Sequence, residues 1–443
     1  MKKILISLMI ILAAFLPSEA KTLKGEINST ISASQIGKSS ISISVKDIES
    51  GKQIFAFNEN MLMHPASIQK ILMLPAAVDV LGADYEFKTA LYKRSESEYL
   101  IKLGADPYLS SDDLNDLVSK IDKFKTQKVY IDDSIIEPKS WGEGWQWDDD
   151  MNISMPRFNS YNLDGNIMKL TVMPSENGSQ AIIINPSKYP LVFLNNVVSG
   201  EENSLKISRD NSISENALML SGTVKTPVVS YIPVNNPKRY FGVKLTQALE
   251  DNRIYLKNPR TISQLKPSDK FTGEISHSIS GAISDILLNS NNMVIETVMK
   301  LAGNKAYGSG TDISGIKVFD AFCAKNGLDN SKIRVVDASG VSKNNLVYAD
   351  FMTTYLIKMK DNEVLKSMAK PDEGTLTGRM IPLKDNLRAK TGTLSDISSI
   401  AGYLTTKSGK NYAFCIMIND PKTTSSDKKT LEDYLIREIY LKG

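Results

Sequence analysis

The sequence predicts an α+β fold, in which helices flank an antiparallel sheet and a long, mostly β segment interrupts the chain. Strand patterns near both ends and apolar helical runs beside them predict the sheet and its helices. Between about residues 92 and 265 the chain instead shows short strand-like runs separated by Asn, Ser, Gly and Pro. A chain of 443 residues exceeds the roughly 250–300 residues of a single core, so at least two domains are expected.

The N-terminus has the features of a secretory signal. Two lysines precede an apolar run over residues 4–16, and small residues follow at Ser18 and Ala20. The run is shorter than the roughly 20 residues that span a bilayer, so we expect cleavage before Lys21 and export, with no transmembrane span in the mature chain.

The composition disfavours several functional classes. A net charge of only +3 argues against a nucleic-acid partner. Two cysteines, Cys323 and Cys415, and two histidines, His64 and His277, lack zinc-site spacing, so no metal or other cofactor is expected. Neither histidine lies in a Gly-x-Ser-x-Gly elbow, which disfavours histidine-based catalysis. Cys415 lies in an apolar run, which favours a buried free thiol.

The expected elements follow in order along the chain. Residues 41–45 and 53–57 form a hairpin, and the apolar stretch from Ser67 to Gly82 predicts a buried helix that ends at the glycine. The further strands expected are 181–184, 191–198, 218–224, 228–234, 398–404 and 411–418, and the further helices are 283–301, 315–326, 349–359 and 431–440. The domains expected are one formed by residues 21–91 and 266–443, and an inserted region at 92–265 with one or two subdomains.

Ser67 and Lys70 are the first candidate catalytic pair. Acyl-bond hydrolysis without histidine or metal needs a hydroxyl nucleophile, a neutral amine and donors for the oxyanion. The two side chains share one helix face, and burial lowers a lysine pKa. The same spacing occurs at 263/266, 314/317, 425/428 and 426/429. Only the pair at 67 and 70 opens a strongly apolar helix.

Two further motifs are weak when taken singly. Ser290-Asn291-Asn292 precedes the helical run 293–301 and could be an ordinary helix cap. Lys390-Thr391-Gly392-Thr393 leads into the strand 398–404 and could be a surface turn. Its glycine would let a substrate approach the backbone, and its lysine and threonines could hold a carboxylate.

The three motifs together resemble the set found in class A β-lactamases and penicillin-binding proteins. The 223 positions between Ser67 and Ser290 leave room for an insertion. This resembles the D-Ala-D-Ala carboxypeptidase/endopeptidase family of class C low-molecular-mass penicillin-binding proteins, the penicillin-binding protein 4 (DacB-like) type. The strings that carry this resemblance are Pro65-Ala-Ser-Ile-Gln-Lys70, Gly104-Ala-Asp-Pro107, Gly144-Trp-Gln-Trp147, Asp337-Ala-Ser-Gly340 and Gly374-Thr-Leu-Thr-Gly-Arg379.

The resemblance implies a serine β-lactamase/transpeptidase-like domain with assigned residue roles. The roles implied are Ser67 as nucleophile, Lys70 as proton acceptor, Ser290 and Asn292 as relay and amide clamp, Lys390 as holder of the terminal carboxylate, and backbone N–H groups of Ser67 and Thr393 as the oxyanion hole. It also implies that Lys390 helps to keep Lys70 neutral through like-charge repulsion.

Substrate contacts are implied for a second group of residues: Thr391, Gly392, Thr393, Ser395, Asp150 and Arg379. An acid and an arginine suit a side chain that ends in an ammonium and a carboxylate, which suggests meso-diaminopimelate. A solvated surface position is the alternative for Asp150.

The expected function is that of a periplasmic serine D-Ala-D-Ala carboxypeptidase, with endopeptidase action also open. Its partners would be peptidoglycan stem peptides ending in D-Ala-D-Ala, and β-lactams would block it covalently. A β-lactamase would instead turn penicillin over rapidly. A non-catalytic peptidoglycan-binding protein would keep its biology after Ser67→Ala, and coincidental motifs in a β-rich domain are the remaining alternative.

Overall fold

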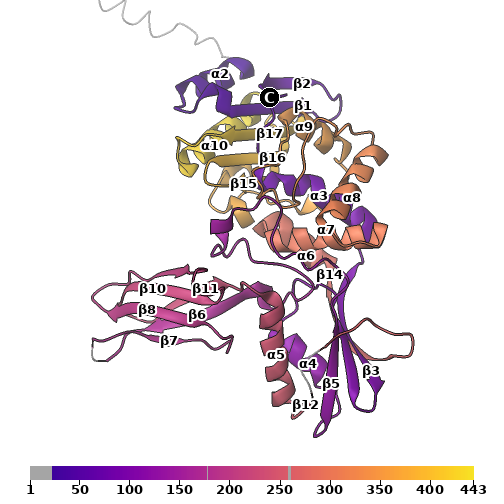
Figure 1. Ribbon diagram of the computed structural model, residues 1–443. Coiled ribbons are helices and arrows are strands. Elements are labelled where there is room, and N and C mark those ends of the chain that lie inside the picture. Colours follow the sequence, from indigo (N-terminus) through magenta and orange to yellow (C-terminus); the bar gives the residue numbers. More distant parts are fainter. Residues whose placement is uncertain (1–21, 177, 258–260) are drawn as a thin grey trace, which may run out of the picture.

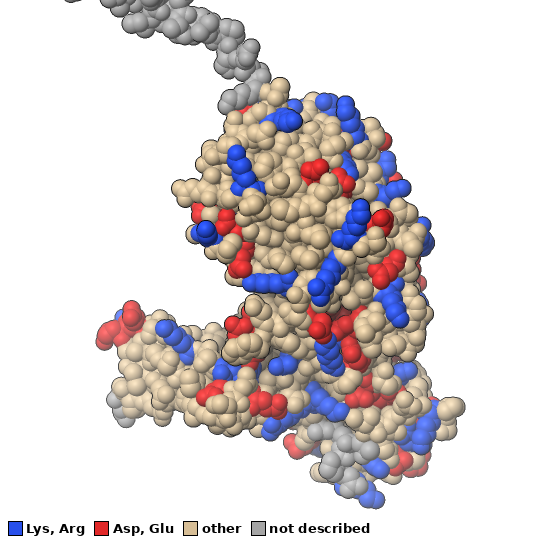
Figure 2. All heavy atoms as spheres, turned by 45° about the horizontal axis from the view of Figure 1, so that its top comes forward, with Lys and Arg blue, Asp and Glu red and all other residues tan. Residues whose placement is uncertain are grey.

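The computed structural model describes residues 22–176, 178–257 and 261–443. The predicted signal at 1–20 lies outside these residues. Figure 1 shows a sheet-and-helix body that carries both described ends of the chain, and a second part built from the middle of the chain. Across the described ranges, no helix combines the length and apolarity needed to cross a bilayer. Figure 2 shows acidic and basic side chains interspersed over one face, as expected from the small net charge.

A five-stranded antiparallel sheet, β15-β16-β17-β1-β2, joins the two ends of the chain in one body. Its strands are β1 (Ile41–Asp47), β2 (Gln53–Phe57), β15 (Leu387–Thr393), β16 (Ile397–Thr405) and β17 (Asn411–Asn419). Because β1 pairs with β17, everything between them must leave the sheet and return. The predicted hairpin and terminal strands are confirmed.

Both faces of this sheet are covered, so its central strands are almost wholly apolar. Side chains of β17 alternate between two cores, since successive residues of a strand point to opposite faces. Phe414 and Ile416 pack in the core that contains α2 (Leu23–Ala33) and α10 (Ser425–Lys442). Cys415 packs in the other core, with the helices that carry the catalytic motifs. The predicted buried free thiol is confirmed.

The helices that contribute most to the second core are α3 (Gln69–Leu81), α7 (Asn292–Tyr307), α8 (Asp312–Lys325) and α9 (Ala349–Lys358). Helix α3 ends at Gly82, where φ is 94°, as the sequence predicts. The single helical run expected at 283–301 is wrong. The chain forms α6 (Ile279–Ser284) and a π-turn, η5 (Asp285–Asn289), and then breaks at Ser290 before α7 begins.

The inserted region begins and ends with one antiparallel ladder, β3 (Glu86–Ser95) against β14 (Lys270–Ser278). The predicted boundaries cut this ladder, because residue 92 falls inside β3 and β14 lies beyond residue 265. We therefore place the insertion at 86–278.

The insertion has two parts in Figure 1. One is a mixed sheet, β12-β5-β4-β3-β14 with β13 beside β5, and the other contains two three-stranded sheets, β8-β10-β9 and β11-β6-β7. The elements are β4 (Glu98–Lys102), α4 (Ser111–Val118), β5 (Thr126–Asp132), β6 (Ile167–Met173), β7 (Ile182–Ile184), β8 (Val192–Ser199), β9 (Lys206–Arg209), β10 (Ala217–Val224), β11 (Val228–Pro233), α5 (Pro237–Asp251), β12 (Tyr255–Leu256) and β13 (Thr261–Ile262).

Candidate active site

Ser67 and Lys70 meet at the start of α3. Ser67 lies in the 3₁₀ turn η2 (Ala66–Ile68), and Lys70 lies in the first turn of the helix that follows. Lys70 Nζ is 2.9 Å from Ser67 Oγ, 2.6 Å from Asn292 Oδ1 and 2.8 Å from the carbonyl oxygen of Ser339. The amine is therefore held against the hydroxyl by two further acceptors.

Burial makes both lysines of the site poor proton binders. Loss of solvation lowers the pKa of Lys70 from 10.5 to about 7, although Asp337 and Glu296 oppose the change by attraction. Burial also lowers the pKa of Lys390, and repulsion by Lys70 lowers it further. Burial is thus the main reason why Lys70 can be neutral near pH 7.

In the second motif, Asn291 caps a helix, whereas Asn292 contacts Lys70. Asn291 is the N-cap of α7, because its side chain accepts from the backbone N–H of Val294 at 3.1 Å. Asn292 instead accepts from Lys70 and donates through Nδ2 to the carbonyl oxygen of Ser154, at 2.8 Å. Ser290 has left-handed backbone angles, φ 64° and ψ 33°, and lines the cleft described below.

The third motif lies on β15, at the edge of the sheet beside η2. A Cβ at Gly392 would lie 2.7 Å from the backbone nitrogen of Ser67 and 2.4 Å from Ser399 Oγ. The glycine is therefore needed for the strand to approach Ser67 itself, whereas the sequence argument assigned that approach to a substrate. Lys390 is fully buried, and its Nζ donates to the carbonyl oxygen of Thr391 at 2.8 Å.

A cleft of about 780 Å³ opens at these motifs. Its lining includes Ser67, Ser290, Asn292, Thr391, Thr393 and Arg379 from the body, and Ile153, Ser154, Pro156 and Asp164 from the insertion. Residues more than 300 positions apart thus share one surface, and the insertion forms part of its wall.

Glu296 was not among the predicted site residues, but it orders the loop that holds Lys70. Glu296 is buried and accepts from the backbone N–H groups of Ala338 at 3.1 Å and Ser339 at 2.8 Å. Burial, and then repulsion by Asp337, raise the pKa of Glu296 to about 8. A signal was present, because Glu296 is the single acid in an apolar run and follows Asn292 by one helical turn.

Asp337 belongs to the same loop and stabilises it through hydrogen bonds of its own carboxylate. Its carboxylate accepts from the backbone N–H groups of Gly340 at 2.8 Å and Ser342 at 2.7 Å, and from Trp145 Nε1 at 2.9 Å. The loop presents the carbonyl of Ser339 to Lys70 as a result. The two acids near Lys70 therefore order this loop mainly through backbone hydrogen bonds.

The outer candidate residues are more dispersed. Arg379 lines the cleft and pairs with Asp433 at 2.6 Å and Glu432 at 2.9 Å. Asp150 lies outside the cleft lining and pairs with Arg209 at 3.1 Å. Ser395 is exposed, donates to the carboxylate of its neighbour Asp396, and is also outside the lining.

A serine hydroxyl beside a buried lysine, an asparagine clamp and a lysine-bearing strand edge define an acyl-transfer enzyme that uses lysine in place of histidine. The chain matches the model of the D-Ala-D-Ala carboxypeptidase 3 (S13) family over residues 23–437, and it belongs to this family of serine peptidases. The family resemblance and the fold class expected from the sequence are confirmed.

Named relatives agree with this assignment. The chain is 26% identical over 416 residues to a D-alanyl-D-alanine carboxypeptidase of Actinomadura sp. (strain R39), covering 85% of this chain and 77% of the relative. It is 23% identical over 430 residues to the D-alanyl-D-alanine carboxypeptidase DacB of Haemophilus influenzae, covering 90% and 89%.

The crystal structure of penicillin-binding protein 4 from Haemophilus influenzae has the same fold. It superposes with a TM-score of 0.81 at 22% identity, over 90% of this chain and 96% of the other. A second crystal structure of that protein, with a bound β-lactam, gives a TM-score of 0.78 at 20% identity, over 94% and 99%.

Proposed function

We propose that the protein is a serine D-Ala-D-Ala carboxypeptidase that trims peptidoglycan stem peptides through an acyl-enzyme on Ser67. The observation that carries this proposal is the 2.9 Å separation of Ser67 Oγ from Lys70 Nζ, an amine whose pKa is about 7. Family membership and the names of the relatives support the substrate class. The proposal includes export to the periplasm.

In the proposed acylation step, Ser67 Oγ attacks the carbonyl carbon between the two terminal D-Ala residues and its proton passes to Lys70 Nζ. Backbone N–H groups of Ser67 and Thr393 would stabilise the oxyanion. The C–N bond then breaks, and the departing amine takes this proton from Lys70 Nζ, with the Ser290 hydroxyl as the proposed relay. Water attacks the ester next and gives a proton to Lys70 Nζ, which is neutral again. Lys70 passes this proton to Ser67 Oγ as the ester C–O bond breaks.

The terminal carboxylate of the substrate would lie against the third motif. Thr391 and Thr393 line the cleft, and Lys390, which precedes Thr391 on the same strand, is fully buried. A carboxylate there would favour the protonated form of Lys390, since opposite charges raise a lysine pKa. Substrate binding would thus restore to this lysine the charge that burial removes.

Recognition of meso-diaminopimelate remains part of the proposal, with Arg379 as the residue for its carboxylate. The position of Arg379 in the cleft lining supports this role. Asp150 would have to exchange its ion pair with Arg209 for the ammonium group of the substrate. The same cleft would admit a cross-linked stem for endopeptidase action.

The test combines penicillin labelling with product analysis. Wild-type protein should gain one penicillin mass on the tryptic peptide that contains Ser67, and Ser67→Ala should gain none. A synthetic stem peptide ending in D-Ala-D-Ala should lose one D-Ala in the presence of the wild type only. A folded wild type that is neither labelled nor active would refute the proposal, and rapid release of hydrolysed penicillin would instead favour a β-lactamase.

A further inference from the structure

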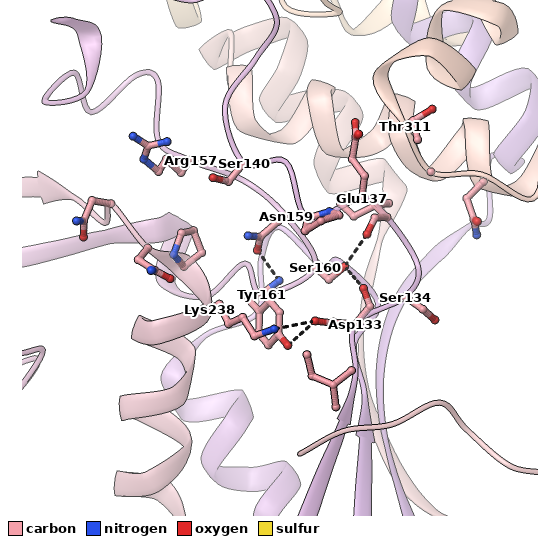
Figure 3. Close-up of a pocket in the computed structure, with 18 of the residues that line it drawn as sticks. Asp133, Ser134, Glu137, Ser140, Arg157, Asn159, Ser160, Tyr161, Lys238 and Thr311 are labelled. Carbon is pink, nitrogen blue, oxygen red and sulfur yellow. Dashed lines mark hydrogen bonds and ion pairs between the residues drawn. The ribbon is translucent and has the colours of Figure 1, made fainter. Parts of the chain in front are cut away.

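A second cleft, of about 930 Å³, is shown in Figure 3. Part of its lining follows the lining of the catalytic cleft directly in the sequence. Residues 153, 154 and 156 line the catalytic cleft, whereas residues 157 and 159–161 line the second. Its other walls come from the segment 133–140, from 235–238 at the start of α5, from Asn304 of α7, and from 308–311 between α7 and α8. The second cleft is thus formed jointly by the insertion and the catalytic body.

The guanidinium of Arg157 lies in this cleft, where Asp150 and Glu215 attract it but neither pairs with it directly. Its guanidinium stacks over the ring of Trp141, with 4.9 Å between the guanidinium carbon and the ring centroid. Within the described residues, it makes neither a hydrogen bond nor an ion pair. The neighbouring cation differs, because Lys238 pairs with Asp133 at 3.3 Å, as Figure 3 shows.

Trp141, the ring on which Arg157 stacks, is connected through Trp145 to the loop that holds Lys70. Trp141 packs edge-on against Trp145, with ring centroids 5.1 Å apart, and donates through Nε1 to the carbonyl oxygen of Trp145 at 3.3 Å. Trp145 in turn donates to Asp337, which closes the loop that holds Lys70. Packed aromatic rings therefore fix Arg157 in position relative to the nucleophile.

We propose that the second cleft binds a carboxylate of a peptidoglycan peptide, with Arg157 as its anchor. A guanidinium whose donors are free is suited to bind a planar carboxylate with two hydrogen bonds. The amide side chains of Asn159 and Asn304 in the lining suit the peptide groups that flank such a carboxylate. Acids in the same lining, among them Glu215, disfavour a polyphosphate or nucleic-acid ligand.

This inference rests on the proposed function, since it gives the same enzyme a second contact with its polymer. A stem peptide in the catalytic cleft would be one contact, and a carboxylate of the surrounding peptidoglycan would be the other. Two contacts on one polymer raise the apparent affinity by effective concentration. The enzyme would then prefer peptidoglycan fragments over short peptides.

The binding test blocks the catalytic cleft with penicillin and titrates the acylated protein with soluble muropeptides by calorimetry. Acylated wild type should bind, and acylated Arg157→Ala should bind at least ten-fold more weakly. Arg157→Lys, which keeps the charge but loses the planar fork, should fall between them. Lys206→Ala is the matched control, because it removes an exposed cation of the insertion outside the cleft.

Equal affinity of wild type and Arg157→Ala would overturn the inference, as would the absence of muropeptide binding by folded, acylated wild type. Failure of the proposed function gives a different result, because no penicillin adduct forms on Ser67. The titration would then be made with Ser67→Ala protein, so that the second cleft is tested in either case. Muropeptides with amidated carboxylates should bind acylated wild type as weakly as unmodified muropeptides bind acylated Arg157→Ala. Undiminished binding of the amidated muropeptides would also count against the inference.

Discussion

Acylation of Ser67 should depend on pH through the charge of Lys70. A lysine with the ordinary pKa of 10.5 would be neutral in well under about 0.1% of molecules at pH 7. With the pKa lowered to about 7, roughly half of the molecules carry the neutral amine at pH 7, and about 1% do so at pH 5. The acylation rate should therefore fall about ten-fold for each pH unit well below 7 and level off above about pH 8.

Rapid-mixing measurements of the second-order rate of penicillin acylation between pH 5 and 9 test this. Circular dichroism at each pH shows whether the protein stays folded. The control is Lys390→Gln, whose remaining acylation rate is measured over the same pH range, because Lys390 is the other buried lysine whose pKa is lowered. If Lys70 is the base, the inflection near pH 7 persists in this variant.

Two results would refute the reasoning. A rate that still rises ten-fold per unit through pH 9 would mean that Lys70 keeps an ordinary pKa despite its burial. A rate that is flat from pH 5 to 8 in folded protein would mean that no group titrating near 7 takes the proton of Ser67.

Three further substitutions follow from the same contacts. Lys70→Met should lower penicillin acylation at least 10²-fold yet raise the melting temperature at pH 7. The lowered pKa costs the folded wild type up to about 5 kcal/mol there. This cost fades as pH rises from about 7 towards 10.5, because over that range the unfolded chain holds a proton that the folded protein has released. A lower melting temperature for the variant would contradict this. Gly392→Ala should slow acylation at least ten-fold, because its Cβ would crowd the backbone of Ser67 at 2.7 Å, whereas Gly281→Ala, which meets no atom within 4 Å, should acylate at the wild-type rate. Glu296→Ala should lower the free energy of unfolding by about 1–3 kcal/mol in urea denaturation, since two loop N–H groups lose their acceptor, and Glu296→Gln, which keeps one oxygen, should lose less.

The sheet and helices of the body were predictable because their hydrophobic patterns are strong. Strand β1 alternates apolar residues with serines, and α3 is apolar over its length and ends at a glycine. Strand β14 was missed because it is mostly polar, and its partner β3 lies about 180 positions earlier in the chain. Pairing at that distance leaves no local signal, which is why the expected start of the insertion fell inside β3 and its expected end fell before β14. The left-handed turn at Ser290 was missed for a related reason, since packing rather than residue type selects it.

The candidate reacting groups could be proposed from the sequence because the chemistry restricts which residue types can serve. A nucleophile without histidine needs an amine, and only one of the seven Ser-x-x-Lys pairs in the sequence opens an apolar helix. The structural partners of the other candidate residues could not be identified from residue types and spacing alone. Asp150 could serve a substrate or a structural ion pair, and only the fold brings Arg209 within 3.1 Å of it.

The pKa of Lys70 could not be predicted from the sequence either. The sequence places Lys70 on an apolar helix, but its pKa depends on complete burial and on the opposing pull of Asp337 and Glu296, residues that are separated from it by more than 220 positions. Those acids are held by backbone N–H groups of a loop, and the loop is held in turn by Trp145 of the insertion. The insertion therefore contributes to the environment of the catalytic lysine as well as to the cleft wall. A change at the Trp145–Asp337 contact should accordingly shift the pH inflection of acylation, even though neither side chain lines the catalytic cleft.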